Sequence, residues 1–301
     1  MKTIADRYTL TTPVARGGMG IVWQATDLRL NRQVAVKLID ENDLADRNDA
    51  TRRFYREARI TARLRHPGVP VVYDFGSDGG ELFMVMEYVE GHMVADLIAE
   101  HHPLPVPWTA LIAAQVCAVL TAAHEAELIH RDIKPDNLVM CPNATVKVID
   151  FGVATSFGAS EFSQITQAGQ IPGSARYTAP ELFDGAQASR STDLYTIGCL
   201  LYELLAGVRP YASKDLMTEI NRSRFEDPPA IGRDDVPRDM GGLTLRLLDK
   251  SADRRPSSAI EVFDVLKTFV RQPPPIPGLV DRDLSNDPVH MYAAVIQHVS
   301  K

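Results

Sequence analysis

The sequence predicts an α+β fold with two lobes, the first small and rich in β-strands and the second larger and mostly helical. Over about the first 85 residues, apolar and polar residues alternate in short runs, as in strands with one buried face. From Pro107 onward, apolar residues recur at helical spacing between long polar connections. The chain has 301 residues, of which 45% are hydrophobic and 24% charged, enough for a sizeable core.

Five runs are expected to form the sheet of the first lobe, with one helix laid on it. They read YTLTTPVA, GIVWQATD, QVAVKLID, VPVVYDFG and LFMVMEYV. An arginine-rich helical stretch lies between the third and fourth runs, and the turn SDGG separates the last two.

The second lobe is expected to be built mainly from helices. Apolar stripes lie in WTALIAAQVCAVLTAAHEAEL, DLYTIGCLLYELLAG and AIEVFDVLKTFV. We place the first lobe at about residues 1–86, a hinge at 87–91 and the second lobe at about 92–270. Because ligand sites favour clefts between lobes, we expect one near the hinge.

Residues 271–301 differ from the rest in composition. They begin with the stiff proline-rich run RQPPPIPG and continue into an expected helix, with Asp287 as N-cap and Pro288 at the first helical position. One face of that helix is apolar and carries Val289, Tyr292, Ile296 and Val299. Two hypotheses follow: the helix docks a partner, or it packs back on the second lobe, which the short stripe favours.

The charge balance argues against nucleic acid as a partner. The net charge is −7, whereas nucleic acids and anionic membranes attract basic surfaces. One local exception is a cluster of arginines, which we interpret as the solvated face of a helix. Its members are Arg47, Arg52, Arg53, Arg56, Arg59, Arg63 and Arg65.

Cysteine usage and hydropathy indicate a cytoplasmic location. Cys117, Cys141 and Cys199 are far apart in sequence and predict neither a disulfide framework nor a zinc site. The run Leu194–Gly207, taken as the most apolar, is too short to span a bilayer and contains Glu203. We therefore expect no membrane segment in this chain, and a membrane tether only if a longer native chain continues past Lys301.

Three features of the first lobe are ambiguous when each is taken alone. The stretch VARGGMGIV, residues 14–22, fits either a plain hairpin turn or a loop that covers phosphates. Lys37 in VAVK fits a solvent-facing strand residue, and Glu57 fits a helix residue paired with Arg53.

Two polar loops of the second lobe indicate a cation site. HRDIKPDN, residues 130–137, precedes the strand-like NLVM, and DFG, residues 150–152, follows the strand-like VKVID. Both sets of polar residues therefore emerge at strand ends. Two carboxylates and an amide that converge there are unfavourable without a cation, and few acidic oxygen ligands suit Mg²⁺ shared with substrate phosphates.

Taken together, these motifs resemble the eukaryotic-like (Hanks-type) serine/threonine protein kinase family, most closely its bacterial and actinobacterial members. The glycine loop, the strand lysine, the helix glutamate, HRDIKPDN, DFG and APE (residues 179–181) occur in the family's order. The resemblance covers about residues 8–270 and implies the bilobal protein-kinase fold.

The resemblance implies a role for each motif residue in transfer of the ATP γ-phosphate to protein hydroxyls. Asp132 accepts the hydroxyl proton, Lys134 contacts the γ-phosphate, and Lys37 holds the α- and β-phosphates with Glu57 as its ion-pair partner. Asn137 and Asp150 hold Mg²⁺, with Mn²⁺ as an alternative. The implied nucleotide-binding residues are Val14, Gly17, Gly18, Gly20, Val22, Ala35, Lys37, Met86, Glu87, Val89 and Val139.

The sequence departs from the family pattern at Ala15, which occupies the position of the first loop glycine. We expect altered loop mobility and nucleotide affinity with retained activity. Lys134 and Ser174 are typical of the serine/threonine branch, so protein serine and threonine side chains are the expected acceptors.

Arg131 before the catalytic aspartate implies activation by phosphorylation of the segment between Asp150 and Glu181. The candidate sites are Thr166, Ser163 and Ser160, with ordinary polar loop residues as the alternative. Self-association for phosphorylation in trans is the implied partner relationship.

Two further positions resemble structural elements of the family. Asp193 resembles a buried aspartate that binds the catalytic loop, although STDLYTIG also fits a plain helix N-cap. Glu181 and Arg255 resemble a buried ion pair. A nucleotide-binding pseudokinase scaffold and a small-molecule kinase remain as alternative functions; the first predicts loss of Lys37, Asp132 or Asp150, and SARYTAPE argues against the second.

Overall fold

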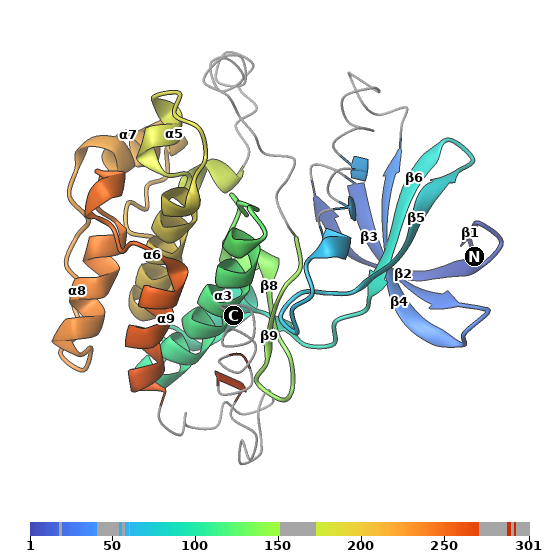
Figure 1. The fold of residues 1–301 in the computed structure, drawn as a ribbon, viewed down its shortest axis with the longest axis horizontal. Helices are drawn as coiled ribbons and strands as arrows, with labels where there is room; N and C mark the ends of the chain where they lie inside the picture. The colour runs from blue at the N-terminus through green and yellow to red at the C-terminus, as the bar shows by residue number, and fades with distance from the viewer. Residues whose placement is uncertain are drawn as a thin grey trace. The chain divides into compact units, whose positions relative to one another are not determined.

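The computed structural model describes residues 1–17, 20–40, 54–55, 58–59, 61–150, 173–270, 288–289 and 292. The chain divides into two compact units, Met1–Glu90 and Gly91–Lys301. The first is built around a β-sheet and the second around helices, which is the α+β architecture that the sequence predicted (Figure 1).

The first unit contains one six-stranded antiparallel sheet in the order β1-β2-β3-β4-β6-β5. The strands are β1 (Thr3–Ile4), β2 (Tyr8–Gly17), β3 (Gly20–Asp27), β4 (Arg32–Asp40), β5 (Val72–Asp78) and β6 (Glu81–Glu87). The last five coincide closely with the five predicted runs, and β1 was not predicted. Gly79 and Gly80 form the β5–β6 turn with φ of 59° and 86°, a region that glycine enters without strain.

The two faces of this sheet bury different sets of side chains because alternate residues of a strand point to opposite sides. Val34 and Val36 of β4 lie in a cluster with Tyr8, Phe83 and Val85. The other face holds a second cluster that includes residues from the arginine-rich segment, which is helical at 54–55, 58–59 and 61–63. Its buried members are Ala35, Ile39, Phe54, Ala58, Leu82, Met84 and Met86.

The second unit is organised around the buried helix α3 (Val106–Glu125), which packs against α6 (Arg190–Ala206), α9 (Ala259–Leu266) and β9 (Val146–Val148). Figure 1 shows α3 in green beside α6 and α9. The other α-helices are α2 (Val94–His101), α5 (Pro180–Phe183), α7 (Leu216–Phe225) and α8 (Arg238–Leu247). Short 3₁₀ helices are η2 (Pro135–Asn137), η3 (Gly173–Tyr177), η4 (Ala252–Arg254) and η5 (Lys267–Phe269).

Helix α3 also corrects the expectation about apolar segments. Among the described helices it alone is long and apolar enough to cross a membrane by length and composition, and it is mostly buried inside the second unit. The core helix of a soluble protein passes the same test, so this is weak evidence for a span. The run Leu194–Gly207, which the sequence analysis singled out, is therefore not the most apolar segment.

A three-stranded antiparallel sheet in the order β7-β8-β9 completes the second unit, with β7 at His92–Met93 and β8 at Leu138–Met140. The described part of the C-terminal segment lies against this sheet. Pro288, Val289 and Tyr292 are helical and buried, and the Tyr292 hydroxyl donates a hydrogen bond of 2.7 Å to the Val146 carbonyl. Of the two hypotheses for this segment, these contacts support packing on the second lobe.

Candidate active site

The glycine stretch of the first unit is the hairpin between β2 and β3. Gly17 pairs with Gly20 across the turn, and Ala15 pairs with Val22. Gly20 has φ 134°, and a Cβ at this position would lie 1.9 Å from the Leu38 carbonyl oxygen of β4. Only glycine fits there, so this glycine is required by the backbone of the hairpin whatever the loop binds.

Lys37 lies on one face of the sheet with other predicted nucleotide-binding residues. It is buried in β4 and follows Ala35 by two positions, so both side chains lie on the same face. Lys37 pairs with Val22 of β3 on one side and with Met84 of β6 on the other. Met86 is buried in the cluster on the same face. The N–H of Glu87 donates to the Val71 carbonyl at 2.8 Å.

The predicted catalytic residues of the second unit form one connected cluster. Asp132 is buried, and its Oδ2 accepts hydrogen bonds from Lys134 Nζ at 2.7 Å and from Asn137 Nδ2 at 2.9 Å. Asn137 Nδ2 also donates to the Asp132 carbonyl at 2.7 Å. These contacts hold the Asp132 carboxylate beside the ammonium group of Lys134. They bind the Asn137 side chain through its amide nitrogen.

This cluster fits a magnesium site completed by phosphate. Because both contacts of the Asn137 amide use its nitrogen, its oxygen is the atom left for a cation. The Ile149 N–H donates to the Asn137 carbonyl at 3.0 Å. Asp150 directly follows Ile149, so this backbone bond links the two proposed ligands. Within the described residues no three His, Cys, Asp or Glu side chains group as a metal site. Mg²⁺ is commonly held by one or two carboxylates together with substrate phosphates, and Asn137 and Asp150 fit a site of that kind.

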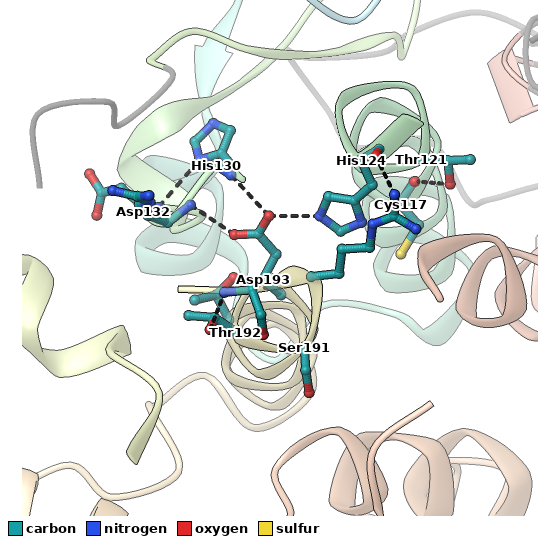
Figure 2. A network of polar contacts seen from close by, with 12 residues as sticks. Cys117, Thr121, His124, His130, Asp132, Ser191, Thr192 and Asp193 are labelled. Carbon is teal, nitrogen blue, oxygen red and sulfur yellow. Dashed lines mark hydrogen bonds and ion pairs between the residues drawn. The ribbon is translucent and has the colours of Figure 1, made fainter. Parts of the chain in front are cut away.

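A buried carboxylate from α6 holds the backbone of the catalytic loop. Asp193 Oδ2 accepts from the His130 N–H at 2.9 Å, and Oδ1 accepts from the Arg131 N–H at 2.7 Å. Figure 2 shows the same carboxylate in contact with His124 of α3, whose Nε2 lies 2.8 Å from Oδ2. The N-cap of α6 is Ser189, which forms a capping box with Thr192, so interpreting Asp193 as a plain N-cap is wrong.

His130 is a buried residue of the catalytic loop. Its side chain is fully buried, and this burial lowers the pKa of the imidazole below its usual value of 6.5 despite the nearby carboxylate of Asp193. The Asp132 N–H donates to His130 Nδ1 at 3.3 Å, which requires an unprotonated nitrogen there. The imidazole is therefore a neutral structural group.

The segment after the catalytic loop is fixed by two ion-pair systems. Arg255 is buried and binds Glu181 through two bonds of 2.8 Å, as the resemblance implied. The second system was not predicted: Glu219 of α7 is buried and paired with both Arg176 of η3 and Arg209. The spacing of Arg176 and Glu219 in the sequence does not predict this pair, because one residue lies in η3 and the other in α7.

Several predicted residues cannot be placed. Gly18, Glu57, Ser160, Ser163 and Thr166 lie outside the described residues, as do residues 151 and 152 of the DFG motif. Ser174 is part of η3. Val139 is buried in β8 and Val22 is partly buried, whereas Val14 is about half exposed and Val89 is partly buried.

Comparison with known proteins agrees with this geometry. The family model for the protein kinase domain matches residues 8–267. Over 94% of its length, the chain is 35% identical to the serine/threonine-protein kinase PknB of Mycobacterium leprae, covering 46% of that protein. It is 34% identical over 92% of its length to PknA of Mycobacterium tuberculosis, covering 64% of that protein.

A third relative lies outside the mycobacteria. A probable serine/threonine-protein kinase of Clostridium perfringens is 34% identical over 90% of the chain and 39% of its own length. The chain thus spans between about two fifths and two thirds of the length of these relatives. The family match and the ordered motifs agree, and the chain belongs to the protein kinase family, with bacterial serine/threonine kinases among its relatives.

Proposed function

We propose that this chain is a protein kinase that uses ATP and Mg²⁺ to phosphorylate serine and threonine side chains of proteins. The observation that carries the proposal is the cluster of Asp132, Lys134 and Asn137. The backbone of the loop that bears this cluster is bound by the carboxylate of Asp193. The names of the relatives support serine and threonine as acceptors. Lys134 and Ser174 support the same choice.

In this proposal Asp132 orients the acceptor hydroxyl and takes its proton. Its carboxylate lies 2.7 Å from Lys134 Nζ, and this ammonium group would also contact the γ-phosphate. Phosphoryl transfer is promoted mainly by positioning and electrostatics, and a buried, tightly bonded aspartate meets both requirements.

Asn137 and Asp150 are the residues that would hold Mg²⁺. The cation, when bound, would neutralise charge that builds up on the phosphates. Lys37 would hold the α- and β-phosphates from its buried position in β4, and the hairpin at Gly17 and Gly20 would cover them with backbone N–H groups. Retention of Lys37, Asp132 and Asp150 argues for this activity over a nucleotide-binding scaffold.

Regulation and location complete the proposal. Arg131 supports activation by autophosphorylation, with Thr166 as the first candidate, and phosphorylation in trans would require transient self-association. The three cysteines are far apart in sequence and two of them are buried, which supports a reducing cytoplasmic location. Mass spectrometry after incubation with ATP tests the first point, since an unmodified Thr166 in a fully active chain contradicts it.

Transfer of labelled γ-phosphate tests the activity itself. The chain is incubated with ATP and Mg²⁺, alone and with a generic basic protein, in parallel with Asp132→Asn. We expect transfer by the wild type and a loss of about 100-fold or more in the variant, because the proton acceptor is removed. ATP binding without transfer by either chain contradicts the kinase activity and favours the scaffold.

A further inference from the structure

The outer edge of β9 is covered by two side chains from distant parts of the second unit. β9 is the edge strand of the sheet β7-β8-β9, and in the described part of the chain no strand pairs with its outer side. The Val146 N–H donates to Gln115 Oε1 at 2.9 Å, and the Val146 carbonyl accepts from the Tyr292 hydroxyl at 2.7 Å. One residue of the edge strand is thus bonded at both its amide and its carbonyl.

Both side chains are completely buried. Gln115 lies in the middle of α3, and its Nε2 donates to the Ala144 carbonyl at 3.0 Å in the turn between β8 and β9. Ala144 has φ 61°, an unfavourable value for a residue with a Cβ. Tyr292 comes from the C-terminal segment, outside residues 8–267 that match the kinase family model.

The hairpin that these residues hold carries both proposed metal-binding residues. Asn137 directly precedes β8, and Asp150 follows β9 by two residues. Leu138 pairs with Val148, and the Ile149 N–H donates to the Asn137 carbonyl at 3.0 Å. A shift of β9 along or away from β8 would therefore change the separation of Asn137 and Asp150.

We propose that Tyr292, together with Gln115, is a positioning residue for the metal site: it fixes the β8–β9 hairpin and thereby the spacing of Asn137 and Asp150. This role rests on the proposed function. It also gives the C-terminal segment a part in nucleotide binding, although Tyr292 lies 142 positions beyond Asp150 in the sequence. Loss of the phenol hydroxyl alone would leave the buried Val146 carbonyl without this donor while the aromatic ring still filled its space.

The test compares Tyr292→Phe with Tyr8→Phe. The control also removes one hydroxyl from a fully buried tyrosine, whose hydrogen bond of 2.8 Å to Asp74 lies in the first unit. Two quantities are measured in each chain: hydrogen exchange of the amides in residues 145–150, and the Mg²⁺ concentration that gives half-maximal binding of ADP. Neither measurement requires phosphoryl transfer.

In Tyr292→Phe we expect faster exchange at residues 145–150 and a Mg²⁺ requirement raised by about three- to tenfold, the range that one lost hydrogen bond corresponds to. Tyr8→Phe should change neither. Unchanged exchange in Tyr292→Phe, or faster exchange with an unchanged Mg²⁺ requirement, overturns the positioning role. So does an equal change in both variants.

The same experiment separates this proposal from the proposed function. A wild-type chain that binds ADP with Mg²⁺ but transfers no phosphate contradicts the kinase activity, while the Tyr292 comparison still decides the positioning role. A wild-type chain whose ADP binding does not depend on Mg²⁺ overturns the positioning role directly.

Discussion

The carboxylate of Asp193 accepts a hydrogen bond of 2.7 Å from the backbone N–H of Arg131, a residue with φ 73°. Positive φ is unfavourable for arginine by about 1 kcal/mol or more, and such strain persists only where surrounding contacts enforce it. Asp132 is the residue that directly follows Arg131 in the chain. Asp193 therefore sets the direction in which the proposed proton acceptor leaves the loop.

We expect Asp193→Asn to lower kcat by at least about tenfold and the free energy of unfolding by about 2–4 kcal/mol, because one of its two oxygens becomes a donor facing other donors. Kinase assays and urea denaturation measure the two effects. Asp184→Asn is the matched control, since that side chain is exposed and pairs only with Arg224 in the described structure. Wild-type kcat in Asp193→Asn would contradict the role given to this carboxylate.

Gly20→Ala should disrupt the hairpin that carries the glycine loop. The added Cβ would lie 1.9 Å from a backbone oxygen of β4, so the strands must separate locally. We expect a loss of about 2 kcal/mol or more in unfolding free energy, together with weaker ATP binding. Gly232→Ala is the control, because a Cβ there meets no atom within 4 Å. Equal stability of the two variants would show that the hairpin tolerates a side chain.

Arg255→Met should destabilise the second unit by about 3–5 kcal/mol, because it leaves the carboxylate of Glu181 without its buried partner. Arg222→Met, which removes an exposed pair with Glu226, should change stability by less than about 0.5 kcal/mol. Chemical denaturation of both variants makes the comparison. Similar small losses in both would mean that the Glu181–Arg255 pair is no stronger than a surface pair.

Stability should fall with acid in two windows. The folded-state pKa of His130 is lowered by burial, so the unfolded chain binds this proton more readily and stability declines as the pH falls below about 6.5. Hydrogen bonds from Arg7 lower the pKa of Asp27 from 3.8 to about 2. The stability that Asp27 contributes is therefore complete above about pH 4 and is lost as the pH falls toward 2.

Urea denaturation between pH 2 and pH 7 measures both windows. Asp27→Asn should be less stable than the wild type above about pH 4, and the difference should shrink as the pH approaches 2. The decline below about pH 6.5 should remain in this variant. A difference that stays constant down to pH 2 would contradict the pKa assigned to Asp27.

The sequence was most informative where the pattern is local. Alternation of apolar residues predicted β2 to β6 almost to their ends, because a strand with one buried face repeats every two residues. It missed the helices α2, α7 and α8, which have only eight to ten residues each, so they depend on the surrounding unit for their stability.

Long-range polar contacts could not be predicted from the residues alone. The alternatives for Asp193 were separated only when the structure placed its carboxylate against the loop at His130, 63 positions earlier in the chain. The contact between Tyr292 and Val146 spans 146 positions. It uses a backbone carbonyl, which every residue has, so the amino-acid sequence gives no sign of it. Motif spacing identified candidate residues, and only the fold shows which of them touch.

The identity of the phosphorylated amino acid tests the central claim most directly. The chain is incubated with labelled ATP and Mg²⁺ and a generic protein substrate, and the products are hydrolysed and separated into phosphoserine, phosphothreonine and phosphotyrosine. We expect label in phosphoserine and phosphothreonine, and none in products made by Asp132→Asn. Label only in phosphotyrosine, or equal labelling by the variant, would contradict a serine/threonine kinase that works through Asp132.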